Sequence, residues 1–166
     1  MSESKSETED DFREVHLRDA DFLGAFAVME SGHGILMVQN DRVIGGRSVR
    51  VWDLPGGQVE PGEELREALA RELGEEVGVR PSSDDAPFLF MQEGVRTIAG
   101  RRAFAWRSFF FSVPEWIGEP AARSEVLAIR FVPRDEMFGV LTAPYHDSFC
   151  EWLRVGGTFF SSAWRD

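Results

Sequence analysis

The sequence predicts an α/β fold in which helices cover a mixed sheet. Three features of the 166-residue chain lead to this prediction. Short apolar runs bounded by turn residues come first, one amphipathic stretch follows them, and further β-rich runs and a second amphipathic stretch come last. Strands on both sides of one central helix, with another helix near the end, are typical of a sheet that has helices packed on its faces.

The segment before the central helix predicts three strands. Residues 22–29 and 35–38 are apolar runs around a glycine-containing turn, and such a pair predicts a β-hairpin. Residues 40–47 contain Gly45 and Gly46 near their end, so we expect a loop there. Residues 48–54 alternate enough to form another strand, which stops at a Pro-Gly-Gly sequence.

One helix is expected in the middle of the chain. Pro61, Gly62 and Glu63 open it, because proline and acids are favoured in a first helical turn, and Gly78 ends it. The other predicted elements are a second hairpin (88–99 with 102–113), an irregular loop (114–124), a buried strand (126–132), one helical turn (135–138) and a closing helix (144–155).

Size, charge and cysteine content exclude several classes of protein. We expect a disordered acidic arm over residues 1–14 and a single domain over residues 15–166. The net charge of −11 argues against nucleic acid as the main partner, and the single cysteine, Cys150, excludes an internal disulfide. Without a recognisable signal peptide or an apolar run long enough for a membrane span, a soluble cytoplasmic protein with no membrane partner is expected.

The central helix places carboxylates where apolar side chains are expected. At about 100° per residue, Leu69 and Leu73 lie on one apolar stripe, and Glu72 and Glu76 fall within that stripe. Glu75 lies at its border. Carboxylates crowded on a core-facing surface repel each other and lose hydration, so they stay ionised only beside a cation. The pattern therefore indicates a hard divalent ion held by oxygen ligands.

The spacing of this segment is specific enough to identify a family. Gly57 is followed by Glu63, Arg71-Glu72-Leu73, Glu75-Glu76 and Gly78-Val79, and this pattern over residues 57–79 resembles the Nudix box at every defined position. In that family, the residues matched by Glu63 and Arg71 brace a loop–helix–loop. The flanking strands are also similar, so the resemblance extends over roughly residues 20–155 and implies a Nudix-like α/β/α sandwich with a mixed central sheet.

The resemblance also implies a reaction and a metal site. Nudix hydrolases cleave a nucleoside diphosphate linked to another group with Mg²⁺ or Mn²⁺, so a small nucleotide is the expected partner. By position, Glu72, Glu75 and Glu76 match the metal-ligand glutamates, and Gly56 or Gly57 matches a glycine that adds a backbone carbonyl. In this interpretation the ion neutralises the diphosphate and lowers the pKa of water, and a carboxylate removes a proton.

Residues outside the box supply further candidates. Glu125, directly before a predicted strand, is preferred over Glu115 and Glu119 as the additional carboxylate that many Nudix enzymes use. Arg50 is the preferred phosphate contact, because arginine binds phosphate through paired hydrogen bonds. Trp52 is a candidate for stacking on a base, with ordinary packing as the alternative.

Several alternatives stay open. The family's markers for ADP-ribose and dinucleoside polyphosphate substrates are missing, and elimination favours a nucleoside triphosphate or a small nucleoside diphosphate derivative. A catalytically silent, nucleotide-binding regulatory module of the same fold is the alternative function. His146 has either a catalytic or a structural role, and the aromatic tail after Gly157 covers this subunit's core, a partner's core in a homodimer, or the substrate.

Overall fold

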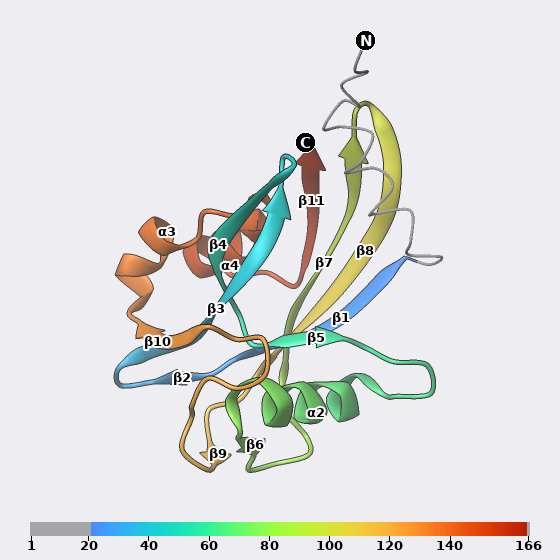
Figure 1. Ribbon diagram of the computed structural model, residues 1–166. Helices are drawn as coiled ribbons and strands as arrows, with labels where there is room; N and C mark the ends of the chain where they lie inside the picture. The colour runs from blue at the N-terminus through green and yellow to red at the C-terminus, as the bar shows by residue number, and fades with distance from the viewer. Residues whose placement is uncertain (1–20, 166) are drawn as a thin grey trace.

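A computed structural model describes residues 21–165, and Figure 1 shows sheets with α2 on one side and α3 and α4 on another. The predicted acidic arm, residues 1–14, lies outside the described residues. Within the described part of the chain, no helix combines the length and the apolar character that a membrane crossing needs.

The larger sheet has five strands in the order β11-β7-β8-β1-β5. They are β1 (Phe22–Val28), β5 (Gly56–Gln58), β7 (Phe88–Ile98), β8 (Arg101–Ser112) and β11 (Phe159–Arg165). The β1/β8 and β11/β7 pairs are parallel, and the β7/β8 and β1/β5 pairs are antiparallel. The predicted mixed sheet and its second hairpin are therefore confirmed. A separate pair joins β6 (Arg80–Pro81) to β9 (Trp116–Ile117), which lies in a segment predicted as an irregular loop.

The smaller sheet extends further than the sequence predicts. It contains β2 (Glu30–Ser31), β3 (Gly34–Ile44), β4 (Arg47–Asp53) and β10 (Ala128–Val132). The predicted loop at 40–47 is wrong, because β3 continues to Ile44 and pairs with β4 up to the turn. Only Gly45 and Gly46 form that turn, with φ angles of 59° and 72°, a left-handed conformation that glycine adopts readily.

The first predicted hairpin is only partly correct. Just the two residues of β2 pair back onto β3. β1 lies instead between β5 and β8 in the larger sheet, where Ala25, Ala27 and Val28 are buried. The apolar character of β1 fits this central position, because a strand inside a sheet has a neighbour at each edge and is packed on both faces.

Helix α2 (Leu65–Val77) begins later than predicted and ends where predicted. The expected start at 61–63 is wrong, because a turn occupies that position and Glu64 caps the helix. The N–H of Glu64 donates to the Glu67 side chain over 2.9 Å, as in a capping box. Gly78 ends the helix with a φ of 70°.

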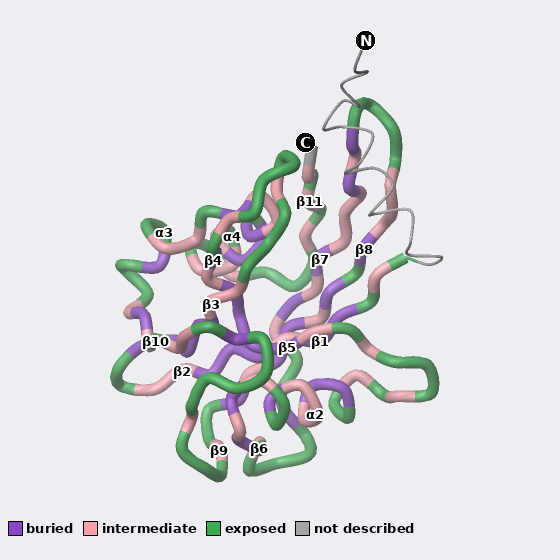
Figure 2. Tube along the Cα trace, viewed as in Figure 1, coloured by how far each residue is buried: buried purple, intermediate pink, exposed green. Residues whose placement is uncertain are grey.

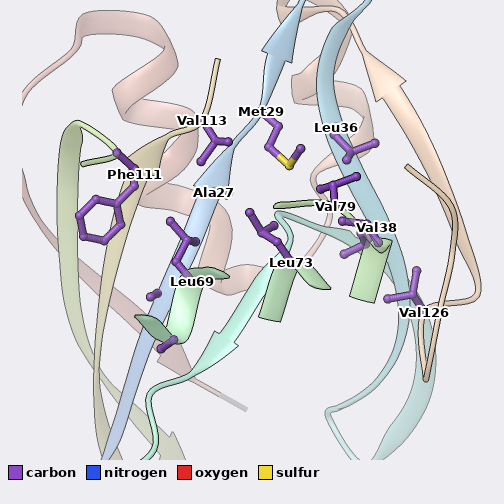
Figure 3. Close-up of a cluster of buried hydrophobic side chains, with 14 residues drawn as sticks. Ala27, Met29, Leu36, Val38, Leu69, Leu73, Val79, Phe111, Val113 and Val126 are labelled. Carbon is purple, nitrogen blue, oxygen red and sulfur yellow. The ribbon is translucent and has the colours of Figure 1, made fainter. Parts of the chain in front are cut away.

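One apolar cluster joins α2 to both sheets. Leu69 and Leu73 of the helix pack with Ala27 of β1 and Val38 of β3, as Figure 3 shows. Burial of this kind contributes on the order of 25 cal/mol for each Å² of apolar surface removed from water. Figure 2 shows that buried residues gather where α2 and the sheets meet, whereas the tips of the long hairpins are exposed.

A second cluster lies under the C-terminal helices. The predicted helical turn and closing helix are present as α3 (Met137–Val140) and α4 (Asp147–Val155). Phe90 of β7 is fully buried there and stacks on Phe110 at a centroid distance of 4.2 Å. Phe160 of β11 meets Phe90 edge-on at 5.5 Å, so the aromatic tail covers the core of its own chain.

Candidate active site

A cavity of about 700 Å³ lies between the β3–β4 hairpin and the larger sheet. Both long hairpins point toward the same end of the molecule in Figure 1. The cavity is lined by five of the residues that the sequence predicts for the site: Gly56, Gly57, Glu72, Glu76 and Glu125. Sequence positions more than 60 residues apart are thus brought together around one opening.

The packing of α2 turns two glutamates toward this cavity. Leu69 and Leu73 are buried on one face of the helix, and Glu72 and Glu76 lie beside them at the cavity wall. Gly57 allows the close approach of β5, since a Cβ at this position would lie 2.8 Å from the Glu72 carboxylate. One oxygen of Glu76, Oε2, is buried and has no hydrogen-bond partner within residues 21–165.

Arg71 braces the segment that leads into the helix. Its guanidinium binds both oxygens of Glu63 at 2.9 Å and donates to the backbone oxygen of Gln58 over 2.9 Å. It also contacts Glu72 at 3.0 Å and Glu75 at 3.3 Å. The hydrogen bonds from Arg71 lower the pKa of Glu63 to about 2. The Glu75 side chain is 55% exposed and turns toward Arg71, so it does not line the cavity.

Burial and mutual repulsion disfavour the charged form of the two inward carboxylates. Burial, followed by the negative charge of Glu72, raises the pKa of Glu76 to about 8. Burial also raises the pKa of Glu72, although Arg71 opposes this. An unpartnered buried oxygen within a set of oxygen donors fits a hard divalent cation. No three His, Cys, Asp or Glu side chains between residues 21 and 165 are grouped closely enough to hold a metal ion.

The loop before Glu125 is attached to the C-terminal end of α2. Carbonyl groups at a helix end lack partners within the helix, and this loop supplies them. The three contacts are Ala121 N–H to Val77 O (3.1 Å), Arg123 N–H to Glu76 O (2.9 Å) and Ser124 Oγ–H to Glu75 O (3.0 Å). Ser124 has a φ of 54°, which is uncommon for a residue with a side chain. The attachment places the exposed Glu125 side chain at the cavity beside the glutamates of α2.

A buried polar network around Asp53 forms another part of the cavity wall. Asp53 is 4% exposed and accepts hydrogen bonds from Tyr145 (2.8 Å), Asn40 (3.0 Å) and Arg42 (3.1 Å). His146 Nε2 lies 2.8 Å from Asp53 Oδ1. Burial alone would raise the pKa of Asp53, but the contacts with His146 and Arg42 hold it well below its usual value. Burial and the charge of Asp53 raise the pKa of Tyr145.

Sequence reasoning missed most of this network. Asn40 and Arg42 were assigned to a loop, whereas both lie on β3, two residues apart and on the same side of the strand. Asp53 lies inside the predicted strand 48–54, and neither Asp53 nor Tyr145 was assigned a role. The one detectable signal was His146 near the start of the predicted closing helix, and His146 is buried and paired with Asp53.

Two predicted contacts lie away from the cavity. The Arg50 side chain is 68% exposed and pairs with Asp41 at 3.6 Å. Trp52 packs against the second apolar cluster, and its backbone oxygen lies 3.1 Å from His146 Nε2. Neither residue lines the cavity. Arg42, on the neighbouring strand β3, lines it instead.

The fold and the glutamates of α2 define an α/β protein of the Nudix class, and comparisons with known proteins agree. The NUDIX domain family matches residues 21–153, and the chain belongs to this family. It is 34% identical over 105 residues to RNA pyrophosphohydrolase of Rhodopseudomonas palustris, covering 61% of this chain and 56% of the relative. It is 38% identical over 71 residues to 8-oxo-dGTP diphosphatase of Haemophilus influenzae, covering 43% of this chain and 47% of the relative. The chain thus spans about half the length of these relatives.

A solved structure supports the same fold. The MutT protein of Bacillus halodurans superimposes with a TM-score of 0.69 and 20% identity, covering 87% of this chain and 89% of that chain. At this level of identity the similarity concerns the arrangement of strands and helices. The predicted Nudix-like sandwich with a mixed central sheet is therefore confirmed.

The raised pKa of Glu76 predicts that the metal-free protein loses stability as pH rises. The folded protein keeps the Glu76 proton up to a pH of about 8, whereas the unfolded chain releases it near the ordinary value of 4.5. The stabilising contribution is complete below the unfolded pKa and is lost as pH rises through the folded pKa. In chelator, Tm of the wild type should fall over this window relative to Glu76→Gln, and Mg²⁺ should restore Tm at pH 8. If Tm depended on pH in the same way in both proteins, the raised pKa of Glu76 would be contradicted.

Proposed function

We propose that this protein is a divalent-metal-dependent pyrophosphohydrolase that cleaves a nucleoside diphosphate linked to another group. One observation carries the proposal: Glu72 and Glu76 face a cavity, and Glu76 keeps a buried oxygen without a partner within residues 21–165. Two neighbouring carboxylates that are largely removed from water need a cation to stay ionised. The alternative, a nucleotide-binding module without catalytic activity, gains no support from residues 57–79, because all glutamates of the Nudix box are retained there.

In this proposal the metal site consists of oxygen donors from α2 and β5. Glu72 and Glu76 hold Mg²⁺ or Mn²⁺, together with a backbone oxygen of Gly56 or Gly57. Glu75 joins them by leaving Arg71, to which it is bound at 3.3 Å through an exposed and therefore weak ion pair. A bound ion supplies neutralisation of the diphosphate charge and a lower pKa for water.

Arg42 is the residue best placed to bind phosphate. Its guanidinium donates to Asp53 at 3.1 Å and 3.0 Å, yet its side chain is 47% exposed and lines the cavity. Its positive charge also acts on Glu76, since it lowers the pKa of that group. Asp53 fixes the orientation of Arg42, so the remaining N–H groups can meet an incoming phosphate at little cost in side-chain entropy.

Glu125 is the proposed general base. Water attacks one phosphorus atom, a new P–O bond forms, and the bridging P–O bond breaks as the departing phosphate takes the electron pair. The water proton passes to the Glu125 carboxylate, which is exposed and lines the cavity. The loop contacts to α2 keep this carboxylate beside the metal ligands.

The substrate class follows from the cavity and the relatives together. The relatives are named for RNA and for 8-oxo-dGTP, which both contain nucleosides joined to phosphate. The cavity is large enough for one nucleotide and combines carboxylates with aromatic side chains. A nucleoside triphosphate or a small nucleoside diphosphate derivative is the proposed substrate.

Removal of the Glu76 charge tests the metal site. With a panel of nucleotides and Mg²⁺ or Mn²⁺, Glu76→Gln should lower kcat by a factor of about 10³ or more, since the carboxylate holds the ion. Product identification by chromatography gives the cleavage site. Glu67→Gln on the exposed face of the same helix is the control, because glutamine preserves the capping box and activity should remain. Full activity of Glu76→Gln would overturn the proposal.

Replacement of Glu125 tests the proposed base. Glu125→Gln should lower kcat by about 10²–10⁴-fold with little change in Mn²⁺ affinity, because the amide cannot accept the proton. Glu119→Gln in the same loop is the control, since Glu119 is exposed and does not line the cavity. An unchanged kcat in Glu125→Gln would assign the base elsewhere.

A further inference from the structure

Two residues that line the cavity each carry a buried polar atom without a hydrogen-bond partner within residues 21–165, and the proposed hydrolysis does not use these atoms. They are Oε1 of Gln92 and the indole Nε1–H of Trp106. The two residues are 5% and 4% exposed, and both line the cavity. The Gln92 amide is oriented by its Nε2, which donates to the backbone oxygen of Tyr145 over 3.3 Å. Since buried polar side chains nearly always have a partner, this pair indicates a ligand.

The strand register places the two side chains next to each other. Gln92 of β7 lies opposite Ser108 of β8, and Gly94 lies opposite Trp106. Side chains two residues apart on a strand share a face, so Gln92 and Trp106 are diagonal neighbours. Gly94 makes room for the indole, because a Cβ there would lie 2.5 Å from the Trp106 ring. The position of the Trp106 ring is therefore set by the sheet itself.

Aromatic side chains pack around the Trp106 indole. Phe104 and Trp164 meet the Trp106 ring at centroid distances of 6.4 Å and 6.3 Å. Phe22 of β1 lies opposite Trp106 in the register. All of these residues line the cavity. Such walls suit a planar ring, and the donor and acceptor suit its polar edge.

Along β1, this part of the cavity lies four residues from the level of Gly56. On β1, Phe26 pairs with Gly56 and Phe22 pairs with Trp106. Four residues along a strand span about 13 Å at about 3.3 Å per residue. A ring held at Trp106 therefore leaves its diphosphate within reach of Gly56 and the glutamates of α2.

We propose that Gln92 and Trp106 recognise the edge of the nucleobase and select bases that carry a ring N–H beside a carbonyl oxygen. This inference rests on the proposed function. One acceptor and one N–H donor match one N–H and one carbonyl. Adenine and cytosine carry an amino group with two N–H bonds, and Gln92 Oε1 can accept only one of them. The other N–H stays unpaired, which is tolerated less well in a buried site than a carbonyl oxygen that accepts a single hydrogen bond. Hypoxanthine, uracil and thymine are therefore preferred, whereas guanine carries an amino group beside its ring N–H.

Matched pairs of nucleoside monophosphates test this selection without any need for turnover. Inosine and adenosine monophosphate differ mainly at the edge in question, and so do uridine and cytidine monophosphate. Calorimetry with Mg²⁺ should show that the wild type binds the first member of each pair at least about 10-fold more tightly. Trp106→Phe and Gln92→Met should each bring this ratio toward one. Trp116→Phe is the control, because Trp116 packs on Phe131 outside the cavity and the ratio should persist.

Nuclear magnetic resonance of the unaltered protein gives a second readout that does not depend on how a variant folds. The indole ¹⁵N–¹H signal of Trp106, assigned by its loss in Trp106→Phe, should move when inosine monophosphate is added and much less with adenosine monophosphate. Equal affinities within both pairs, or an unmoved Trp106 signal, would overturn this inference even if nucleotides are hydrolysed. Selection without hydrolysis of any nucleotide would support this site and overturn the proposed reaction.

Discussion

The face of α2 that builds the core also carries two of the carboxylates that build the site. Leu69 and Leu73 are essentially fully buried, and Glu72 and Glu76 lie beside them where water is scarce. Desolvation penalises a carboxylate charge far more than it penalises a leucine. Burial therefore favours the protonated form of Glu76, and in the proposed site a divalent cation compensates both carboxylates.

Several features of the fold keep the two glutamates in this position. Gly57 lets β5 approach the Glu72 carboxylate, and Arg71 fastens the preceding segment to the helix through Glu63. The loop at 121–124 covers the last carbonyls of α2 and brings a further carboxylate to the same end. Each contact restricts how the helix can move relative to β5. The site is thus held by rigid elements, which favours precise positioning of a metal and a phosphate.

The sequence predicted the parts of this account that depend on local spacing. The box over 57–79, the glycine that ends α2 and the hairpin β7–β8 each have a signal within a short segment. The helical periodicity predicted the inward glutamates, and the Nudix resemblance supplied the sandwich. Helix starts and strand partners were less predictable, because Pro61-Gly62-Glu63 suits a turn as well as a first helical turn, and an apolar run such as β1 does not specify its neighbours.

The rest of the cavity depends on contacts between distant strands. Asn40 and Arg42 are residue types that are common in loops. In the structure β3 pairs with β4, and both side chains donate hydrogen bonds to Asp53. Gln92 and Trp106 have no local motif, and only the β7–β8 register makes them neighbours. Arg50 was a reasonable candidate by residue type, yet it points to solvent because of its place on β4. Residue chemistry therefore predicted the kind of site, and strand pairing determined which residues line it.

The central claim is that a divalent cation compensates Glu72 and Glu76. The most direct measurement is an anomalous difference map from a crystal of the wild-type protein soaked in Mn²⁺. The account predicts a peak within coordinating distance of both carboxylates and no such peak in Glu76→Gln. A map in which both side chains stay ordered and Mn²⁺ is absent between them, at concentrations that saturate activity, would contradict it.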